Sequence, residues 1–266
     1  MRRAITALLE PRSHQFRRMF PRLIPLAYWP GRESIPIDHV VSPLRYDIVV
    51  RERYFEVVRE RRGLADQDFE AFMALSRQQP YFSWFTEVVI PGYRPEMVGD
   101  DQRVDAAFER RVRGCIELHD AFESAGYDRR RPMILRTGHR IAPTSTGKHL
   151  TRRIYAGDGC HRLACLRAAG VEVLEPDMYR LHVAQTLTPR DDTALLLRLI
   201  AISPRDYFSF LSLSYADGEL HTEEALLDHV RSTDPERLPE LRQVIAVDLP
   251  LLNAANRSPL DFASTQ

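Results

Sequence analysis

Four side chains with reactive or hydrogen-bonding groups stand close together near the middle of the chain: Asp158, Cys160, His161 and Arg162. They belong to the stretch AGDGCHRLACLRAAG at residues 156–170. A guanidinium can grip phosphate oxygens in a bidentate manner, and an imidazole adds a further donor. A carboxylate could cap a helix, hold a metal ion or orient a hydroxyl. The stretch therefore predicts an anion site, and the simplest ligand is the phosphate of a nucleotide.

The elements around this stretch place those side chains at a bend. RRIYA, residues 152–156, has the β-branched and aromatic character of a short strand. Leu163, Leu166 and Ala169 then recur at helical spacing until Gly170 ends the helix. The first N–H groups of a helix lack partners within it, and the helix dipole is positive there. The same spacing is typical of an ordinary capped turn with an exposed histidine and arginine, so both interpretations stay open on spacing alone.

Length and composition are those of a soluble globule. The 266 residues are 44% hydrophobic and 28% charged, enough for one large domain or a core domain with extensions. No segment has the roughly 20 uninterrupted apolar residues of a membrane span, and the first apolar run is too short for a secretory signal. The 3 cysteines include no CxxC pair, which argues against a disulfide framework or a cysteine zinc site, and we expect Cys115 and Cys165 in the core. We expect a cytoplasmic protein.

The net charge of zero conceals blocks of opposite sign. Residues 1–62 carry 13 arginines against 7 acids, and residues 216–248 carry 3 arginines against 9 acids. Residues 129–167 carry 10 basic residues against Asp158 alone, so this middle block favours anionic ligands.

Three zones follow from the pattern of apolar residues, and together they predict an α+β fold. Residues 1–84 form a mostly helical extension. Residues 85–187 alternate short apolar runs with helices and form a mixed α and β zone, which the resemblance described below implies is the nucleotide-binding domain. Residues 188–266 form a C-terminal helical region.

The periodicity also predicts individual elements. Strands are expected at 85–90 (FTEVVI), 132–136, 152–156 and 178–184. Helices are expected at 46–62, 66–79, 104–124 with an end at Gly126, 160–169, 191–202, 204–215, 222–232 and 235–245. Thr222 and Asp234 have the side chains and positions of helix starts.

The residues Gly157-Asp158-Gly159-Cys160-His161-Arg162, followed by LACLRAAG and a strand, resemble the central signature of the ParB/sulfiredoxin superfamily. Its members carry a G-x-H-R or G-E-R-R turn that opens a helix ending in an Ala/Gly pair. The order of elements over 85–187 is similar to the family's: a first strand, a proline-containing loop, an amphipathic helix and a Pro-led second strand. The resemblance implies a ParB/sulfiredoxin-like small mixed sheet with helices, here with N- and C-terminal helical extensions.

Three branches of the superfamily imply different chemistry. ParB binds CTP and clamps onto DNA, sulfiredoxin uses a cysteine in G-C-H-R to repair a sulfinic acid, and the free serine kinases carry D-G-H-H-R and phosphorylate a small hydroxyl compound. Asp158 and Gly159 match the kinase form, whereas Cys160 stands where sulfiredoxin has its nucleophile. A DNA clamp would need a basic recognition face after the nucleotide domain, and the C-terminal zone is acidic.

The resemblance therefore implies a nucleotide-dependent phosphotransferase, a small-molecule kinase whose acceptor is a hydroxyl compound such as serine. The implied cofactors are ATP, ADP or CTP, with Mg²⁺. The alternatives are a sulfiredoxin-like sulfinyl reductase that uses Cys160 and a non-catalytic ParB-like regulator that binds nucleotide or DNA. We expect a small-molecule substrate and no nucleic-acid partner for the kinase; a protein partner or a homodimer through the helical extensions is a further alternative.

The implied site has catalytic and nucleotide-binding parts. Asp158 would bind the metal ion or the acceptor, and Glu96, in the loop after the first strand, would act as general base. Cys160 would be the nucleophile of the reductase alternative. We expect the nucleotide to contact the turn and its neighbours, namely Gly157, Gly159, Cys160, His161, Arg162, Lys148, Thr137 and Arg136. Other acids of the same region are alternative bases, namely Asp100, Asp101 and Glu87, and the alternative for Glu96 is an ordinary exposed acid.

The neighbours of the turn carry weaker signals. TSTGKH at 144–149 resembles half of a phosphate loop, but Ala142 and His149 replace the first glycine and the final hydroxyl residue of that motif. We therefore expect a hairpin loop from which Lys148 would reach a phosphate. Arg136 and Thr137 would line the same cleft from the second strand, and a charged strand edge is the alternative.

Overall fold

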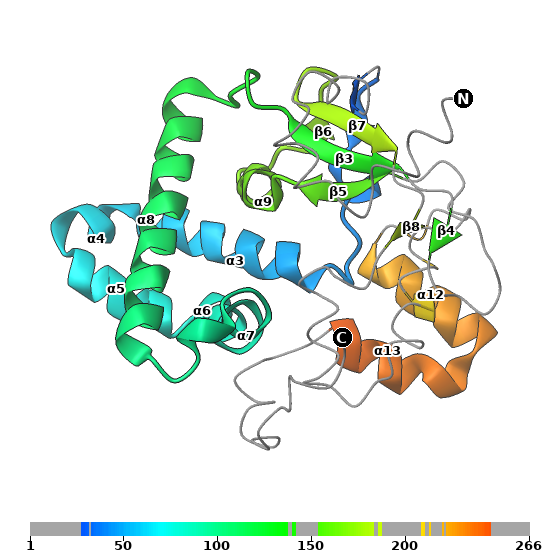
Figure 1. Cartoon of the computed structure of the whole chain (residues 1–266). Coiled ribbons are helices and arrows are strands. Elements are labelled where there is room, and N and C mark those ends of the chain that lie inside the picture. Colours follow the sequence, from blue (N-terminus) through cyan, green and yellow to red (C-terminus); the bar gives the residue numbers. More distant parts are fainter. Residues whose placement is uncertain are drawn as a thin grey trace.

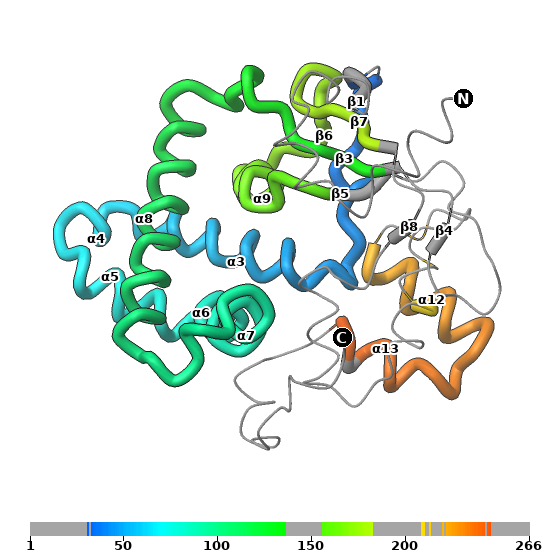
Figure 2. Tube along the Cα trace, in the orientation of Figure 1, coloured from blue at the N-terminus to red at the C-terminus, as the bar shows by residue number. Residues whose placement is uncertain are grey.

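The fold is α+β, mostly helical with a small mixed sheet (Figure 1). The computed structural model describes residues 28–31, 33–137, 140–141, 154–183, 186–187, 209–210, 213, 220 and 222–245. The tube in Figure 2 follows the course of the backbone through the same elements. The predicted fold class is thus confirmed at the level of α+β.

Helices dominate the chain before the inner strands of the sheet. They are α3 (Tyr46–Glu60), α4 (Arg62–Gln67), α5 (Phe69–Arg77), α6 (Pro80–Trp84), the π-helix η3 (Phe85–Val89), α7 (Ile90–Tyr93) and α8 (Asp101–Ala125), with 3-10 turns η2 (Ile37–His39) and η4 (Pro95–Met97). Asp68 caps α5 by accepting a hydrogen bond from the Ala71 amide, and Asp100 caps α8 by accepting one from the Arg103 amide. Gly126, with φ of 70°, ends α8 as predicted.

The predicted strand at 85–90 is wrong. These residues form η3 and the first residue of α7, and they continue the helical path of α6. Phe85, Val88 and Ile90 are buried among helices, and a short apolar run does not by itself distinguish a strand from a buried helix. The Thr86 hydroxyl also donates to the Phe82 carbonyl one turn earlier, at 3.1 Å, which fits the helical path.

The main sheet has four strands in the order β1-β7-β3-β5. They are β1 (Tyr28–Pro30), β3 (Met133–Thr137), β5 (Ile154–Asp158) and β7 (Tyr179–Val183). The central pair β7 and β3 is parallel and both outer pairs are antiparallel, so the sheet is mixed. The predicted strands at 132–136, 152–156 and 178–184 are confirmed where the structure describes them, while 152–153 and 184 lie outside the described residues.

Two short strand pairs accompany the main sheet. They are the antiparallel pair β2 (Ile35–Pro36) and β6 (Val173–Leu174) and the parallel pair β4 (Arg140–Ile141) and β8 (Thr186–Leu187). Through β1 and β2, the N-terminal zone pairs with strands of the middle zone. The boundary between these zones at residue 85 stays a prediction.

Helix α9 (Cys160–Ala168) lies between the sheet and α3, as Figure 1 shows. Its apolar face is formed by Leu163, Ala164 and Leu166, which are buried in one core with residues of α3 and α8. The predicted helix at 160–169 is confirmed, and Gly170 follows its end with φ of 76°. The start of α9 is therefore held from both sides, by the sheet and by the helical layer.

Among the described residues of the C-terminal zone lie α12 (Glu223–Thr233), η6 (Pro235–Arg237) and α13 (Leu238–Ile245). Thr222 caps α12 by accepting a hydrogen bond from the Ala225 amide at 3.2 Å, and Asp234 precedes η6, so both predicted starts are confirmed. The predicted helix at 191–202 lies outside the described residues, and so does most of the one at 204–215. None of the helices in the described part of the chain has both the length and the apolar character that crossing a membrane requires.

A buried ionic group lies where α3 begins. Asp47 is 2% exposed and accepts hydrogen bonds from Arg45 Nε at 2.8 Å and from Arg51 Nη1 at 3.2 Å. Arg45 also donates from Nη1 to the carbonyl of Ala156 in β5, at 3.0 Å. One carboxylate therefore joins two buried guanidinium groups, one of which reaches the sheet.

We expect Asp47→Asn to lower the free energy of unfolding by about 3–5 kcal/mol, because it leaves buried guanidinium groups beside a neutral amide. Asp66→Asn is the matched control, since Asp66 is exposed in its ion pair with Arg62 and should contribute only about 0–1 kcal/mol. Urea denaturation of both variants at pH 7 measures the two losses. If both variants lost equally little free energy of unfolding, the buried ion pairs of Asp47 would not stabilise the fold as expected.

Candidate functional site

The bend between β5 and α9 requires a glycine at position 159. Gly159 has φ of 87° and ψ of 22°, in the left-handed region. A Cβ atom there would lie 2.8 Å from Cγ of Met133 and 3.0 Å from Nη2 of Arg162. Asp158, which is exposed, accepts a hydrogen bond from the Gly159 amide at 2.7 Å. The predicted turn is therefore present. Its second glycine, Gly159, is required because a larger residue there would be strained and would clash with Met133 and Arg162.

The first glycine of the turn lies at an irregularity of the sheet. Strand β3 shifts register between Ile134, opposite Asp158, and Leu135, opposite Ala156, which leaves Gly157 as an extra residue. A Cβ atom on Gly157 would lie 2.7 Å from both Cγ and Nε of Arg136. The two glycines thus make room for two arginine side chains, Arg136 and, at Gly159, Arg162.

The N-terminus of α9 has no side-chain cap. Its N-cap residue is Gly159, whose carbonyl accepts from the Leu163 amide at 2.9 Å. Gly157, Gly159 and Cys160 are half-buried, so the bend is partly open to solvent. An uncapped helix start with two guanidinium side chains beside it can bind an anion.

Arg162 lies over the bend but already has acceptors. Its Nη1 donates to the carbonyl of Arg131, and it lies 3.5 Å from the Tyr127 hydroxyl. Both acceptors are neutral, so the positive charge of the guanidinium is not cancelled by these contacts. The loop between α8 and β3 therefore borders the site.

Cys160 lies beside a buried cation. Its Sγ is 3.9 Å from Nη2 of Arg45, at the start of α3. The other two cysteines are buried as predicted, and burial raises the pKa of Cys115 to about 11 and that of Cys165 to about 12. Cys160 is thus the one cysteine that is both partly exposed and next to a guanidinium.

His161 points into the interior, toward α6. Its Nε2 lies 3.0 Å from the Tyr81 hydroxyl, and the two rings meet edge to face. Burial lowers the pKa of His161 well below its ordinary value, and the positive charges of Arg51 and Arg111 lower it further, while Asp47 opposes them. The imidazole is therefore neutral at pH 7, and its predicted contact with a phosphate stays a prediction.

For the remaining predicted site residues, the structure describes no side-chain contact with the bend. Glu96 is exposed in η4, and within the described residues no hydrogen bond or ion pair joins it to the bend; only its carbonyl accepts, from Arg103 at 3.3 Å. Asp100 is occupied as the cap of α8. Thr137 ends β3, with only its backbone described, and Lys148 lies outside the described residues.

The described part of the chain contains no cluster of side chains that could by itself hold a metal ion. No three histidine, cysteine, aspartate or glutamate side chains there stand together as a ligand set. The exposed carboxylate of Asp158 is the acid closest in sequence to the bend, and Mg²⁺ commonly keeps waters and phosphate oxygens as its other ligands. The Mg²⁺ requirement stays a prediction.

Four residues that contact the site carry no motif: Arg45, Tyr81, Tyr127 and Arg131. They come from elements far from the turn in sequence, and their types and spacing are those of ordinary helix and loop residues. The basic run at 129–131 is the only signal that points toward any of them.

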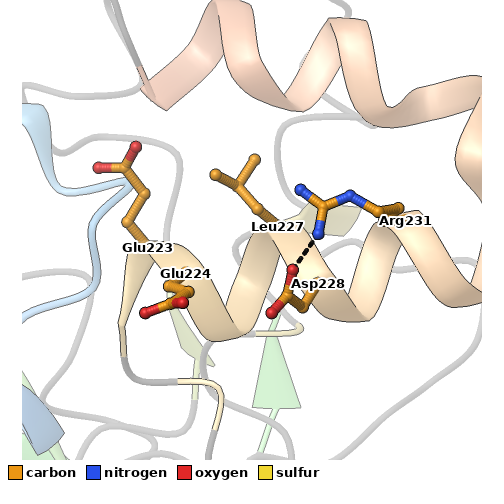
Figure 3. Close-up of a pocket in the computed structure, with 5 residues that line it drawn as sticks. All are labelled: Glu223, Glu224, Leu227, Asp228 and Arg231. Carbon is orange, nitrogen blue, oxygen red and sulfur yellow. Dashed lines mark hydrogen bonds and ion pairs between the residues drawn. The ribbon is translucent and has the colours of Figure 1, made fainter.

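A separate hollow lies along α12. It is lined by Glu223, Glu224, Leu227, Asp228 and Arg231, and Arg231 pairs with Asp228 (Figure 3). Three carboxylates against one guanidinium make this surface acidic, which does not suit a phosphate. None of the predicted site residues belongs to it.

No protein-family model matches the chain, and no curated protein and no solved structure matches it either.

We expect Gly159→Ala to destabilise the fold more than Gly170→Ala. Both glycines have positive φ, 87° and 76°, so alanine costs about 1–2 kcal/mol at either position. Of the two, only Gly159 has atoms within 4 Å of the place that the alanine methyl group would occupy, and overpacking there adds about 1–3 kcal/mol. Urea denaturation compares the two, and equal losses would show that Met133 and Arg162 do not confine the bend.

The pKa of His161 predicts a pH-dependent stability. Because folding lowers this pKa, the unfolded chain binds the proton more readily, and the stability that His161 contributes is lost as pH falls through about 6.5 toward the folded value. We expect the wild type to lose about 1.4 kcal/mol per pH unit in that window relative to His161→Gln. Urea denaturation at pH 7.5 and 5.5 tests this, and parallel pH dependences of the two proteins would refute it.

Proposed function

We propose that the bend at Gly157–Arg162 binds the phosphate tail of a nucleotide and that the protein is a nucleotide-dependent phosphotransferase. The observation that carries this proposal is the left-handed Gly159 at the uncapped start of α9, with the Arg136 and Arg162 side chains against the two glycines. Helix amides and guanidinium groups together match the charge and the hydrogen-bonding capacity of phosphate. The resemblance of GDGCHR to the ParB/sulfiredoxin turn supports the same ligand and the finer fold assignment.

Each residue of the bend has a role in this proposal. The α9 amides and Arg162 would bind the phosphates, with Arg162 turning from the neutral carbonyl of Arg131 to a charged oxygen. Asp158 would hold Mg²⁺ or the acceptor hydroxyl, and it is exposed and so accessible to both. Mg²⁺, when bound, would neutralise part of the phosphate charge.

The transfer itself forms one bond and breaks one. The acceptor oxygen bonds to the terminal phosphorus, the bridging P–O bond breaks toward the nucleotide, and the hydroxyl proton passes to a carboxylate. Glu96 is the predicted base from the loop after a strand, but that strand is a helix here, so its place in the site rests on the resemblance alone. A hydroxyl metabolite such as serine remains the proposed acceptor, and a cytoplasmic location remains the expected one.

A second candidate function has one observation in its favour. Cys160 is partly exposed beside Arg45, and a cation next to a cysteine stabilises the thiolate that a sulfinyl reductase needs. Two positions before this cysteine, however, Asp158 matches the kinase form of the turn and not the sulfiredoxin form. We therefore rank the reductase second.

Turnover by the purified protein separates these functions. We expect phosphoryl transfer from ATP, ADP or CTP to serine with Mg²⁺, followed by phosphorus NMR, and a loss of about 100-fold or more in Asp158→Asn. Activity should survive in Cys160→Ser and in the control Asp66→Asn, which changes an exposed acid on α4.

The other outcomes are equally informative. Activity lost in Cys160→Ser but kept in Asp158→Asn would favour the reductase, assayed on a sulfinic acid. Nucleotide binding by calorimetry without turnover would favour a regulator. No binding of any of the three nucleotides, or binding unchanged in Arg162→Gln, would exclude the bend as a phosphate site.

A further inference from the structure

We propose that the interior between α6 and α8 holds a second anion site, where Trp84 and Arg111 bind a small oxyanion, the carboxylate or phosphate group of a small molecule. Trp84 is the last residue of α6, and Arg111 lies in the middle of α8. The inference does not rest on the nucleotide site, because it uses none of the residues of the bend.

Two buried donors at this place have no acceptor. Trp84 is 0% exposed, and its Nε1–H has no hydrogen-bond partner among the described residues. Nη1 of Arg111 is buried and has none there either. Buried donors are almost always satisfied in native proteins, so two neighbouring exceptions point to an acceptor that the described residues do not supply.

The charge around these donors selects an anion. The Cζ atom of Arg111 lies 5.9 Å from the centre of the Trp84 ring and 5.0 Å from that of Phe85, so the two donor-bearing side chains are neighbours. The Cζ atom of Arg51 lies 4.4 Å from the centre of the same indole. Arg111 forms no ion pair with any residue that the structure describes. Both guanidinium groups lie over the indole ring, so positive charge gathers there, and guanidinium and indole N–H donors suit the oxygens of a carboxylate or phosphate.

The backbone next to Trp84 is π-helical, which is consistent with a binding site there. The π-helix η3 starts at Phe85, directly after Trp84. Single π-helical turns are rare and occur frequently at functional sites. This observation concerns the backbone and is independent of the missing acceptors.

The second site adjoins the inner side of the first without sharing residues with it. Burial raises the pKa of Tyr81, whereas the charges of Arg111 and Arg51 and a hydrogen bond with Arg111 oppose this rise. The Tyr81 hydroxyl contacts His161 of α9. An anion at Trp84 and Arg111 would offset the positive charge that His161 experiences from these arginines.

Tryptophan fluorescence can test this site directly, because the chain has only 2 tryptophans. In Trp29→Phe, Trp84 is the sole reporter. We expect its emission to change saturably with sodium formate or sodium phosphate, the two probes distinguishing a carboxylate from a phosphate ligand. Sodium chloride at matched ionic strength is the control for screening.

Variants on α8 identify the residue responsible. Arg111→Met in the Trp29→Phe background should weaken the response about tenfold or more, because a charge-assisted hydrogen bond is lost. Arg110→Met, one position away on the exposed face, should leave it unchanged. The unfolding midpoint should also rise with the effective probe in the wild type and not in Arg111→Met.

The proposal is overturned by an absent response, by one that chloride reproduces, or by one that Arg111→Met retains. If circular dichroism shows that Arg111→Met does not fold, Arg111→Lys keeps the charge but loses the planar fork, and an unweakened response there also overturns it. Nucleotide binding in Arg162→Gln and Asp158→Asn is measured separately, so failure here leaves the proposal for the bend in place.

Discussion

The arrangement of the bend depends on the buried guanidinium of Arg45. It is 4% exposed, it is paired with Asp47 of α3, and it donates to the Ala156 carbonyl of β5. It also lies against Cys160, the first residue of α9. A buried guanidinium is stable only where its N–H donors have hydrogen-bond acceptors. The contacts of Arg45 therefore fix α3, β5 and the start of α9 relative to one another. The N-terminal zone is in this way part of the site and not an appendage to it.

Local signals explain what the sequence could predict. Helix α8 was predictable because its apolar residues recur at helical spacing and Gly126 ends it, and the bend was predictable because glycines flank Asp158. Those features depend on residues a few positions apart. The error at 85–90 has the opposite cause, since whether an apolar run is a strand or a helix depends on its neighbours in space. Strand β1 was missed for the same reason, because its partner β7 lies far later in the chain.

The same distinction applies to the site. Gly157, Asp158 and Gly159 form the turn that their types predicted, and Arg162 lies over it. The direction of the His161 side chain was beyond prediction, because its partner Tyr81 lies 80 residues earlier on α6. Arg45 was beyond prediction as well, since nothing in its local sequence indicates a contact with the turn. Sequence therefore located the bend, and the fold decided which of its side chains face outward.

The inward His161 changes the electrostatics expected of the bend. A histidine at a phosphate site is usually considered as a donor whose charge varies near neutral pH. Here burial and the charges of Arg51 and Arg111 lower the pKa of the imidazole and hold it neutral, with its Nε2 at the Tyr81 hydroxyl. In the proposed phosphate site, the attraction for an anion would then come from groups whose charge does not vary in this range, which are the α9 amides and the guanidinium groups of Arg136 and Arg162. His161 would act on the bend by fixing the first turn of α9 against α6.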